Sequence, residues 1–401
     1  MPAPMESPNA ARFAVPVFSC FLYLWIAATS SLNPVWASQV CEFPAIFNFG
    51  DSNSDTGGLA AALWGAPPLP NGQTYFRRAT GRYSDGRLII DFIAQSFGLP
   101  YLDAYLNSVG TNFTHGVNFA TSASTIELPS IIFPHLDGFS PFYLGIQYDQ
   151  YMGFMSKSDF LRLQGGVFAS LVPKHEFFNN ALYTFDIGQN DLGRGFFGNK
   201  TIKQVNDSMP DIIDQFSRHV ENIHQLGARY LWIHNTGPIG CLPYILVKFP
   251  TAERDEFGCA KAHNEVAQYF NHKLKEAVVK LRQSLSPPAA ITYVDVYSVK
   301  YSLYSNPGKY GFEKPLEACC GYGENKYKYG IVGCGYSKVV NGSEVFGRAC
   351  GRPSVRVNWD GIHYTEAANH LIFHRISSGA FSDPPIPLNM SCRHHNHLPQ
   401  I

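Results

Sequence analysis

Residues 44–58 read Pro-Ala-Ile-Phe-Asn-Phe-Gly-Asp-Ser-Asn-Ser-Asp-Thr-Gly-Gly, an apolar segment followed by a small, polar one. The first half, residues 45–49, is a short apolar run that predicts a buried β-strand. The second half is small, polar and glycine-rich, which is typical of a tight loop at the end of a strand. Ser52 lies where a parallel α/β sheet presents side chains to the crevice beyond its strands. A serine there is either a nucleophile or a turn residue bonded to its own backbone, and this stretch alone favours the turn.

The same alternation of strand, loop and helix continues along the chain. Apolar runs predict further strands from residues 116, 181, 229 and 291, and helical periodicity predicts helices over about 87–98, 146–172, 205–226, 266–285 and 365–377. This order predicts an α/β fold with one mostly parallel sheet covered by helices on both faces. Because no repeat or low-complexity linker interrupts it, we expect a single domain over 38–392, with a Cys-rich surface excursion at about 319–350 and a flexible tail over 393–401.

Composition and the N-terminus indicate where the protein works. The 401 residues include 31 basic and 31 acidic side chains, so no net charge favours nucleic acid or an anionic membrane. The apolar run over 13–28 is short for a membrane span and is interrupted by Pro16. Small residues at Val35 and Ala37 predict that a signal peptide, residues 1–37, is removed. We therefore expect a secreted protein, with the cell wall or the vacuole as its destination.

Cysteines and acceptor sequons agree with secretion. Eight cysteines remain after the predicted cleavage, and an even number suggests disulfides in an oxidising compartment. Their clustering suggests local pairs, Cys241 with Cys259 and others within 319–350, with the pairing otherwise open. A zinc site is the competing interpretation, but no Cys-x-x-Cys pair with a matching histidine pair is present. Five Asn-x-Ser/Thr sequons predict N-glycosylation, at Asn112, Asn199, Asn206, Asn341 and Asn389.

Residues with catalytic chemistry follow the predicted strands or precede the last helix. Parallel strands bring such loops to one edge of the sheet, so residues far apart in sequence can meet. A nucleophilic serine needs a base, a group that orients the base, and donors for the developing oxyanion. His363 can be the base and Asp360, three residues earlier, can orient it. The alternative is that Asp360 caps the following helix and His363 is exposed.

Asn190 is the candidate oxyanion donor on a side chain. Its amide N–H could bind the oxyanion together with the backbone N–H groups of Ser52 and Ala123. The alternative is that residues 188–191, Gly-Gln-Asn-Asp, form an ordinary turn. Each of these signals is weak by itself.

Taken in order, the blocks resemble the plant GDSL esterase/lipase family of the SGNH hydrolase superfamily. Residues 47–57 resemble its first block, 116–125 its second, 188–191 its third and 360–363 its fifth. The early-nodulin-like GDSL esterases carry the same Gly-Asp-Ser-Asn-Ser-Asp-Thr-Gly run. The resemblance implies a flavodoxin-like three-layer α/β/α sandwich and no metal or organic cofactor.

The resemblance also implies the site. Ser52 is expected to be the nucleophile, with Asp360 and His363 completing the triad and Asn190, Ala123 and Ser52 supplying the oxyanion hole. The chain departs from the family pattern at Asn53, in place of the leucine of the family's name, and at Ala123, in place of a glycine. Alanine keeps the backbone N–H, but it would be strained if the position needs a positive φ.

The implied activity is that of a serine carboxylic ester hydrolase with an acyl-enzyme on Ser52. Its partner would be a small-molecule ester, with no nucleic acid and no stable membrane insertion. Two alternatives stay open: an acyltransferase that uses the same acyl-enzyme, and a catalytically silent, glycosylated wall or defence protein. The residues do not identify the acyl group, the alcohol or the oligomeric state.

Overall fold

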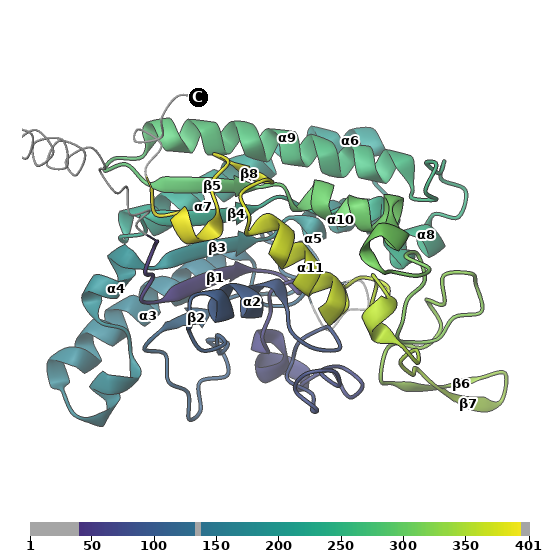
Figure 1. The fold of residues 1–401 in the computed structure, drawn as a ribbon, viewed down its shortest axis with the longest axis horizontal. Helices are drawn as coiled ribbons and strands as arrows, with labels where there is room; N and C mark the ends of the chain where they lie inside the picture. The colour runs from purple at the N-terminus through teal and green to yellow at the C-terminus, as the bar shows by residue number, and fades with distance from the viewer. Residues whose placement is uncertain (1–39, 133–137, 394–401) are drawn as a thin grey trace, which may run out of the picture. The chain divides into compact units, whose positions relative to one another are not determined.

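A computed structural model describes residues 40–132 and 138–393 (Figure 1). The expected signal peptide over 1–37 lies outside the described residues, and so does the expected tail after its first residue. The described residues from Cys41 onward form one compact unit. Within the described ranges, no helix has the length and apolarity needed to cross a bilayer.

A six-stranded sheet lies at the centre, in the strand order β2-β1-β3-β4-β5-β8. Its strands are β1 (Ile46–Gly50), β2 (Gly116–Asn118), β3 (Leu182–Asp186), β4 (Tyr230–His234), β5 (Ala290–Val294) and β8 (Ser382–Asp383). The first five are parallel, and only β8 runs antiparallel, at the edge beside β5. The predicted mostly parallel sheet is confirmed.

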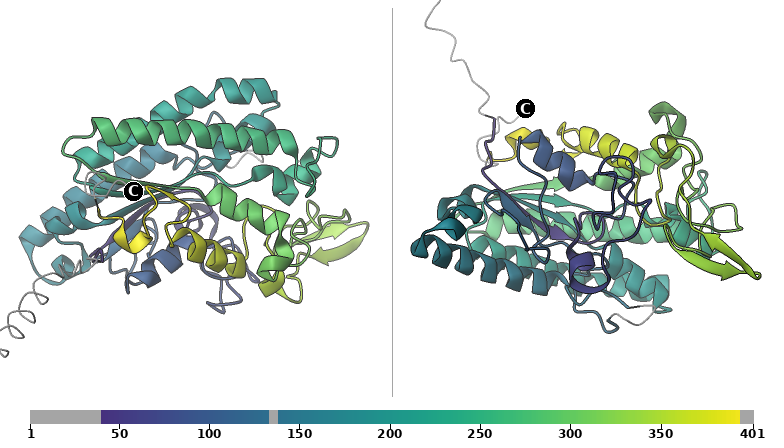
Figure 2. Two further views of the ribbon diagram at one scale, coloured as in Figure 1. Left: turned by 45° about the horizontal axis from the view of Figure 1, so that its top comes forward. Right: turned by 90° about the horizontal axis from the view of Figure 1, so that it is seen from below.

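Helices cover both faces of this sheet (Figures 1 and 2). One face carries α3 (Leu144–Gln164), α7 (Met209–Gln225) and α9 (Lys261–Ser284), and the other carries α2 (Ile89–Ser96), α10 (Val296–Ser305) and α11 (Glu366–Ile376). Shorter elements complete the unit: η1 (Ala60–Trp64), η2 (Val167–Leu171), α4 (His175–Asn180), α5 (Gln189–Phe197), α6 (Ile202–Asp207), η3 (Ile239–Cys241), α8 (Pro243–Lys248), η4 (Pro307–Tyr310), β6 (Ser337–Val340), β7 (Ser343–Phe346), η5 (Pro353–Val355) and η6 (Leu388–Met390). The predicted three-layer α/β/α sandwich is therefore confirmed.

Two of the predicted helices differ from the observed ones. The helix predicted over 205–226 is two helices, α6 and α7, separated at Ser208. Pro210 lies in the first turn of α7, where its missing N–H is tolerated, but it could not continue a helix from α6. The helix predicted over 146–172 ends at Gln164, because Gly165 and Gly166 adopt positive φ angles of 73° and 75°.

Stacked aromatic rings hold β1 in the core. Phe49 stacks between Phe119 and Phe185, with ring centroids 5.3 Å and 5.1 Å away, and Phe47 stacks on Phe178 at 5.1 Å. Aromatic pairs of this kind add to the stabilisation that burial already gives. They fix the strand, so the loop that leaves it starts from a rigid support.

Four disulfides staple the unit. Cys241–Cys259, Cys319–Cys350 and Cys320–Cys334 are local, as the clustering predicted. The fourth, Cys41–Cys392, joins residues 351 positions apart. The Cys-rich excursion carries the β6–β7 hairpin, which projects away from the sheet (Figure 1).

Candidate active site

The loops that follow β1, β2 and β3 meet at one edge of the sheet. The Asp51 N–H donates to the Asp186 carbonyl oxygen at 3.1 Å, and the Thr121 N–H donates to the Gly50 carbonyl oxygen at 3.3 Å. This is the edge where the carboxyl ends of parallel strands create a crevice. Three of the four predicted blocks are thus brought together.

The loop after β1 holds Ser52, which is 6% exposed. The preceding carboxylate shapes the turn: Asp51 Oδ1 accepts from the Asn53 backbone N–H at 2.9 Å and from the Asn53 side-chain amide at 3.0 Å. None of the described residues accepts a hydrogen bond from the Ser52 N–H. Because buried N–H groups are nearly always paired, this free donor is suited to bind an oxyanion.

The loop after β2 presents Ala123 in a strained conformation. Its φ is 61°, in the left-handed region, so the strain anticipated for alanine is present. That region costs a residue with a Cβ about 1–2 kcal/mol. Within the described ranges the Ala123 N–H has no acceptor, while its carbonyl oxygen accepts from the Ser140 N–H at 3.0 Å. A second backbone donor is thus available at this edge.

Asp55 joins these two loops, a role that the sequence reasoning missed. Its carboxylate accepts from the backbone N–H groups of Gly57, Gly58 and Leu59, and from both the N–H and the hydroxyl of Ser122. Burial raises the pKa of the Asp55 carboxyl, against hydrogen bonds that lower it. The only local signal is an acidic residue before two glycines, because its other partner is 67 residues away.

Asn190 lies in the first turn of α5, which starts after Gly188 at a φ of 119°. Asn190 Nδ2 donates to the Ser124 carbonyl oxygen at 3.0 Å and to Asp51 Oδ2 at 3.3 Å. The side chain is therefore held between the loops that carry Ser52 and Ala123. Both amide hydrogens have partners, so an oxyanion has to share or replace one of them, and the longer bond to Asp51 is the weaker.

Asp360 and His363 contact each other directly. Asp360 Oδ2 lies 2.7 Å from His363 Nδ1, and Asp360 Oδ1 accepts from the backbone N–H groups of Ile362 and His363 at 3.0 and 2.9 Å. The alternative interpretation is wrong in both parts: the cap of α11 is Thr365, and the His363 side chain is 9% exposed. Burial alone would raise the pKa of Asp360, but the charge and hydrogen bonds of His363 hold it below its ordinary value.

The far side of the His363 imidazole is unpartnered within the described ranges and packs beside Tyr83. Its Nε2 is buried and has no hydrogen-bond partner among the described residues. The Tyr83 ring lies 5.2 Å from the imidazole, between centroids. No hydrogen bond joins Ser52 to His363 in the described part of the chain, so the contact between nucleophile and base stays a prediction.

A buried cluster of charged groups lies close to Asp51, the residue before Ser52. Trp232 Nε1 donates to His234 Nε2 at 3.0 Å, so His234 Nδ1 carries the hydrogen that Asp186 Oδ2 accepts at 3.2 Å. Burial raises the pKa of Asp51 to about 7, with the Asp186 charge contributing. For Asp186 burial is outweighed, and the His234 hydrogen bond and the Lys300 charge lower its pKa. Asp186 and His234 thus bond to each other inside the protein.

The structure also places the predicted glycosylation sites. Among the sequons, Asn112, Asn199, Asn341 and Asn389 are exposed and Asn206 is half-buried. Asp191, next to Asn190, is buried and accepts from the N–H groups of Ile126 and Glu127. Within residues 40–132 and 138–393, no group of three His, Cys, Asp or Glu side chains is arranged to hold a metal ion.

Comparisons with known proteins agree with this architecture. The family model described as GDSL-like Lipase/Acylhydrolase matches residues 46–376. A protein named "Esterase" from Hevea brasiliensis is 60% identical over 90% of this chain and 92% of its own length. "GDSL esterase/lipase ENOD8" from Medicago truncatula is 59% identical over 90% of this chain and 92% of its own length. "Alpha-L-fucosidase 3" from Arabidopsis thaliana is 52% identical over 88% of this chain and 95% of its own length.

Proposed function

The chain belongs to the GDSL-like lipase/acylhydrolase family, among its plant esterase/lipase members, and from this premise we propose that it is a secreted serine esterase that forms an acyl-enzyme on Ser52. The observation that carries the proposal is the 2.7 Å contact of Asp360 with His363 Nδ1, which leaves the buried Nε2 without a partner. An imidazole held in this way keeps a free lone pair on Nε2, as a general base requires.

The reaction follows from these groups. Ser52 Oγ attacks the ester carbonyl carbon as its proton passes to His363 Nε2, and Asp360 stabilises the imidazolium that forms. The tetrahedral oxyanion accepts from the Ser52 N–H, the Ala123 N–H and Asn190 Nδ2. The alcohol leaves with the proton from His363, which then takes a proton from water as that water attacks the acyl-enzyme. The second tetrahedral intermediate then collapses: the bond from Ser52 Oγ to the acyl carbon breaks, His363 returns its proton to Ser52 Oγ, and the carboxylic acid is released.

Two unpaired backbone donors support the oxyanion assignment. The N–H groups of Ser52 and Ala123 have no acceptor within the described ranges, although Ser52 is buried. Ala123 supplies its backbone rather than its side chain, so replacement of the family's glycine leaves the donor in place. This favours an active enzyme over the catalytically silent alternative.

Secretion is supported by the chemistry of the surface and of the cysteines. Four disulfides are typical of proteins that fold in an oxidising compartment. Four of the five sequons are exposed, and we propose these as the glycosylated positions. The substrate is a small carboxylic ester, and an alcohol in place of water would make the same acyl-enzyme a transferase.

Hydrolysis of nitrophenyl esters of graded chain length tests the proposal. Ser52→Ala should abolish turnover and labelling by a fluorophosphonate, whereas Ser54→Ala, in the same buried loop, should keep both. Unchanged turnover in Ser52→Ala would overturn the proposal. A nitrophenyl fucoside in the same panel tests for the glycosidase activity that the name "Alpha-L-fucosidase 3" gives to the third relative. An added acceptor alcohol tests for acyl transfer.

A further inference from the structure

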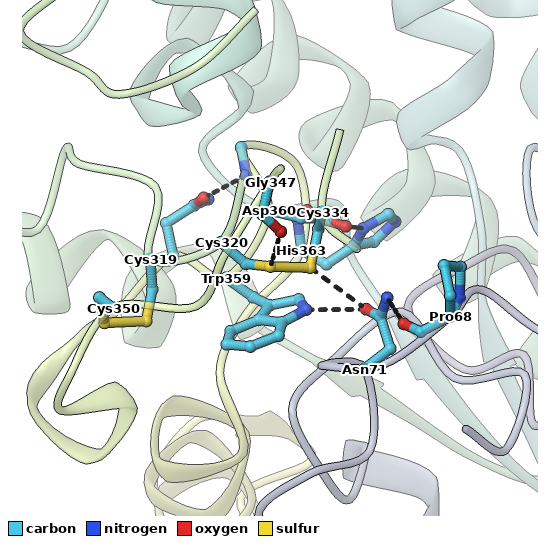
Figure 3. The surroundings of a disulfide bond; sticks show 12 residues. Pro68, Asn71, Cys319, Cys320, Cys334, Gly347, Cys350, Trp359, Asp360 and His363 are labelled. Carbon is cyan, nitrogen blue, oxygen red and sulfur yellow. Dashed lines mark hydrogen bonds and ion pairs between the residues drawn. A yellow bond between two sulfur atoms is a disulfide. The ribbon is translucent and has the colours of Figure 1, made fainter. Parts of the chain in front are cut away.

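The Cys-rich excursion is bonded to the two residues that precede Asp360 (Figure 3). The Cys319 N–H donates to the Asn358 carbonyl oxygen at 3.1 Å, and the Cys320 N–H donates to the Trp359 carbonyl oxygen at 2.6 Å. Cys319, Cys320, Cys334 and Trp359 form a small buried cluster apart from the main core. The excursion is thus packed and hydrogen-bonded against the chain just ahead of the candidate acid and base.

Trp359 is also held from a third part of the chain. Its Nε1 donates to Asn71 Oδ1 at 2.9 Å, and Asn71 Nδ2 donates to the Pro68 carbonyl oxygen at 2.8 Å. Trp359 is fully buried, and Asn71 is 2% exposed. In Figure 3 the indole nitrogen and the Cys320–Cys334 disulfide both face the Asn71 amide. A buried indole nitrogen needs such a partner, so the bond fixes the ring in one orientation.

Hydrogen bonds within the turn over residues 358–363 link the position of Trp359 to that of His363. The Trp359 N–H donates to the His363 carbonyl oxygen at 2.7 Å, and the Gly361 N–H donates to Asn358 Oδ1 at 2.6 Å. Tyr329, from the excursion, packs so closely on Gly361 that a Cβ there would lie 2.0 Å from its ring. A displacement of Trp359 therefore moves the backbone that carries His363.

We propose that Trp359, Asn71 and the Cys320–Cys334 disulfide are positioning residues for the Asp360–His363 pair, a role that rests on the proposed function. None of them is required to touch the substrate. Catalytic groups misplaced by about 1 Å can lose about 100-fold in rate, so a brace outside the site can set the turnover. The imidazole contacts the Asp360 carboxylate and lies beside the Tyr83 ring. Burial raises the pKa of Tyr329 to about 12, with the Asp360 charge contributing.

Trp359→Phe tests the positioning role most directly, because it keeps a buried aromatic ring and removes the indole N–H that donates to Asn71. We expect kcat to fall about 10-fold or more with KM nearly unchanged. We also expect the acid limb of the kcat/KM profile to move to lower pH, since a looser Asp360 contact stabilises the imidazolium less. The double variant Cys320→Ala/Cys334→Ala should shift both readouts in the same direction. Asn71→Leu combined with Trp359→Phe should be no worse than the more damaging single change.

Tyr151→Phe is the matched control for lost stability. It removes one fully buried hydroxyl, bonded to Tyr183 at 2.8 Å near the opposite end of β3. It should lower Tm like Trp359→Phe but leave kcat and the pH profile alone. If Trp359→Phe lowers Tm and leaves both kcat and the pH profile unchanged, the proposed positioning role is overturned. A Ser52→Ala variant that keeps its turnover would instead overturn the proposed function, so the two failures are distinguishable.

Discussion

Replacing Asp360 by asparagine should reverse the hydrogen bond that orients His363. Asp360 Oδ1 accepts from two backbone N–H groups, so the single amide oxygen of asparagine would take that position. Its NH₂ group would then lie where Oδ2 is now, 2.7 Å from His363 Nδ1. For Nδ1 to accept a hydrogen bond from this NH₂ group, the imidazole has to carry its hydrogen on Nε2. In that tautomer His363 cannot take a proton from Ser52.

The magnitude follows from two losses. In the productive tautomer, the Nδ1 hydrogen would face the NH₂ group of the asparagine and make no hydrogen bond. Leaving a buried hydrogen bond unmade costs roughly 1–3 kcal/mol. The imidazolium formed in the transition state also loses its carboxylate, about 4 kcal/mol for charges about 4 Å apart at an effective dielectric constant of about 20. Together they exceed about 5 kcal/mol, which corresponds to a loss of at least about 10³-fold in kcat/KM.

Asp255→Asn is the matched control for this variant. Asp255 Oδ1 also accepts from two backbone N–H groups, those of Phe257 and Cys259, and its Oδ2 accepts from the Tyr301 hydroxyl, with no contact to His363. Steady-state hydrolysis of a nitrophenyl ester should fall by at least about 10³-fold in Asp360→Asn and less than about 3-fold in Asp255→Asn. A loss below about 10-fold in a folded Asp360→Asn protein would refute the reasoning.

Three further predictions concern the same edge of the sheet. Asn190→Ala should lower kcat by about 10²–10³-fold with little change in KM, as for loss of one oxyanion donor, and an unchanged kcat in single-turnover assays would exclude that role. Ala123→Gly should keep activity and change the free energy of unfolding by about +1 kcal/mol or less. The relief of strain at φ 61° is offset by the greater freedom of the unfolded chain. A marked loss of unfolding free energy in urea titrations would contradict this prediction. The raised pKa of Asp51, about 7, means that its contribution to stability is present below about pH 4 and is lost as the pH rises through about 7. Asp51→Asn should therefore remove up to about 1.4 kcal/mol per pH unit from the slope of the unfolding free energy over this window, and an unaltered slope in urea titrations would show that Asp51 does not titrate there.

The parts of the fold that depend on local pattern could be predicted. The apolar run before Ser52 forms β1, and the strands at 182, 230 and 290 begin within one residue of their predicted starts. The break between α6 and α7 was not predicted, because the buried residues of the two helices follow each other at helical spacing from Val205 through Met209 to Ile213. Pro210 was the available signal, and it outweighs the periodicity.

The site depends on contacts that no local pattern contains. Asp360 before His363 reads the same for a helix cap as for an orienting carboxylate, and only the capping of α11 by Thr365 separates the two. Asn190 was expected to donate its amide N–H to the oxyanion, and its two partners in the structure, Asp51 and Ser124, come from loops far away in the sequence. Asp55 was missed because its second set of partners comes from another strand's loop. Cys41–Cys392 could not be paired from spacing, because its two residues are 351 positions apart in the sequence.

That last disulfide has a practical consequence for engineering. It holds the Cα atoms of Cys41 and Cys392 at 5.8 Å, and the Cys41 N–H donates to the Asn389 carbonyl oxygen. A short linker could therefore fuse the two ends and replace the bridge. New ends could be opened at the exposed turn of the β6–β7 hairpin, Asn341–Gly342. Such a circular permutant would have the same sheet with a different order of synthesis, and an affinity tag at the new ends would sit on the projecting hairpin.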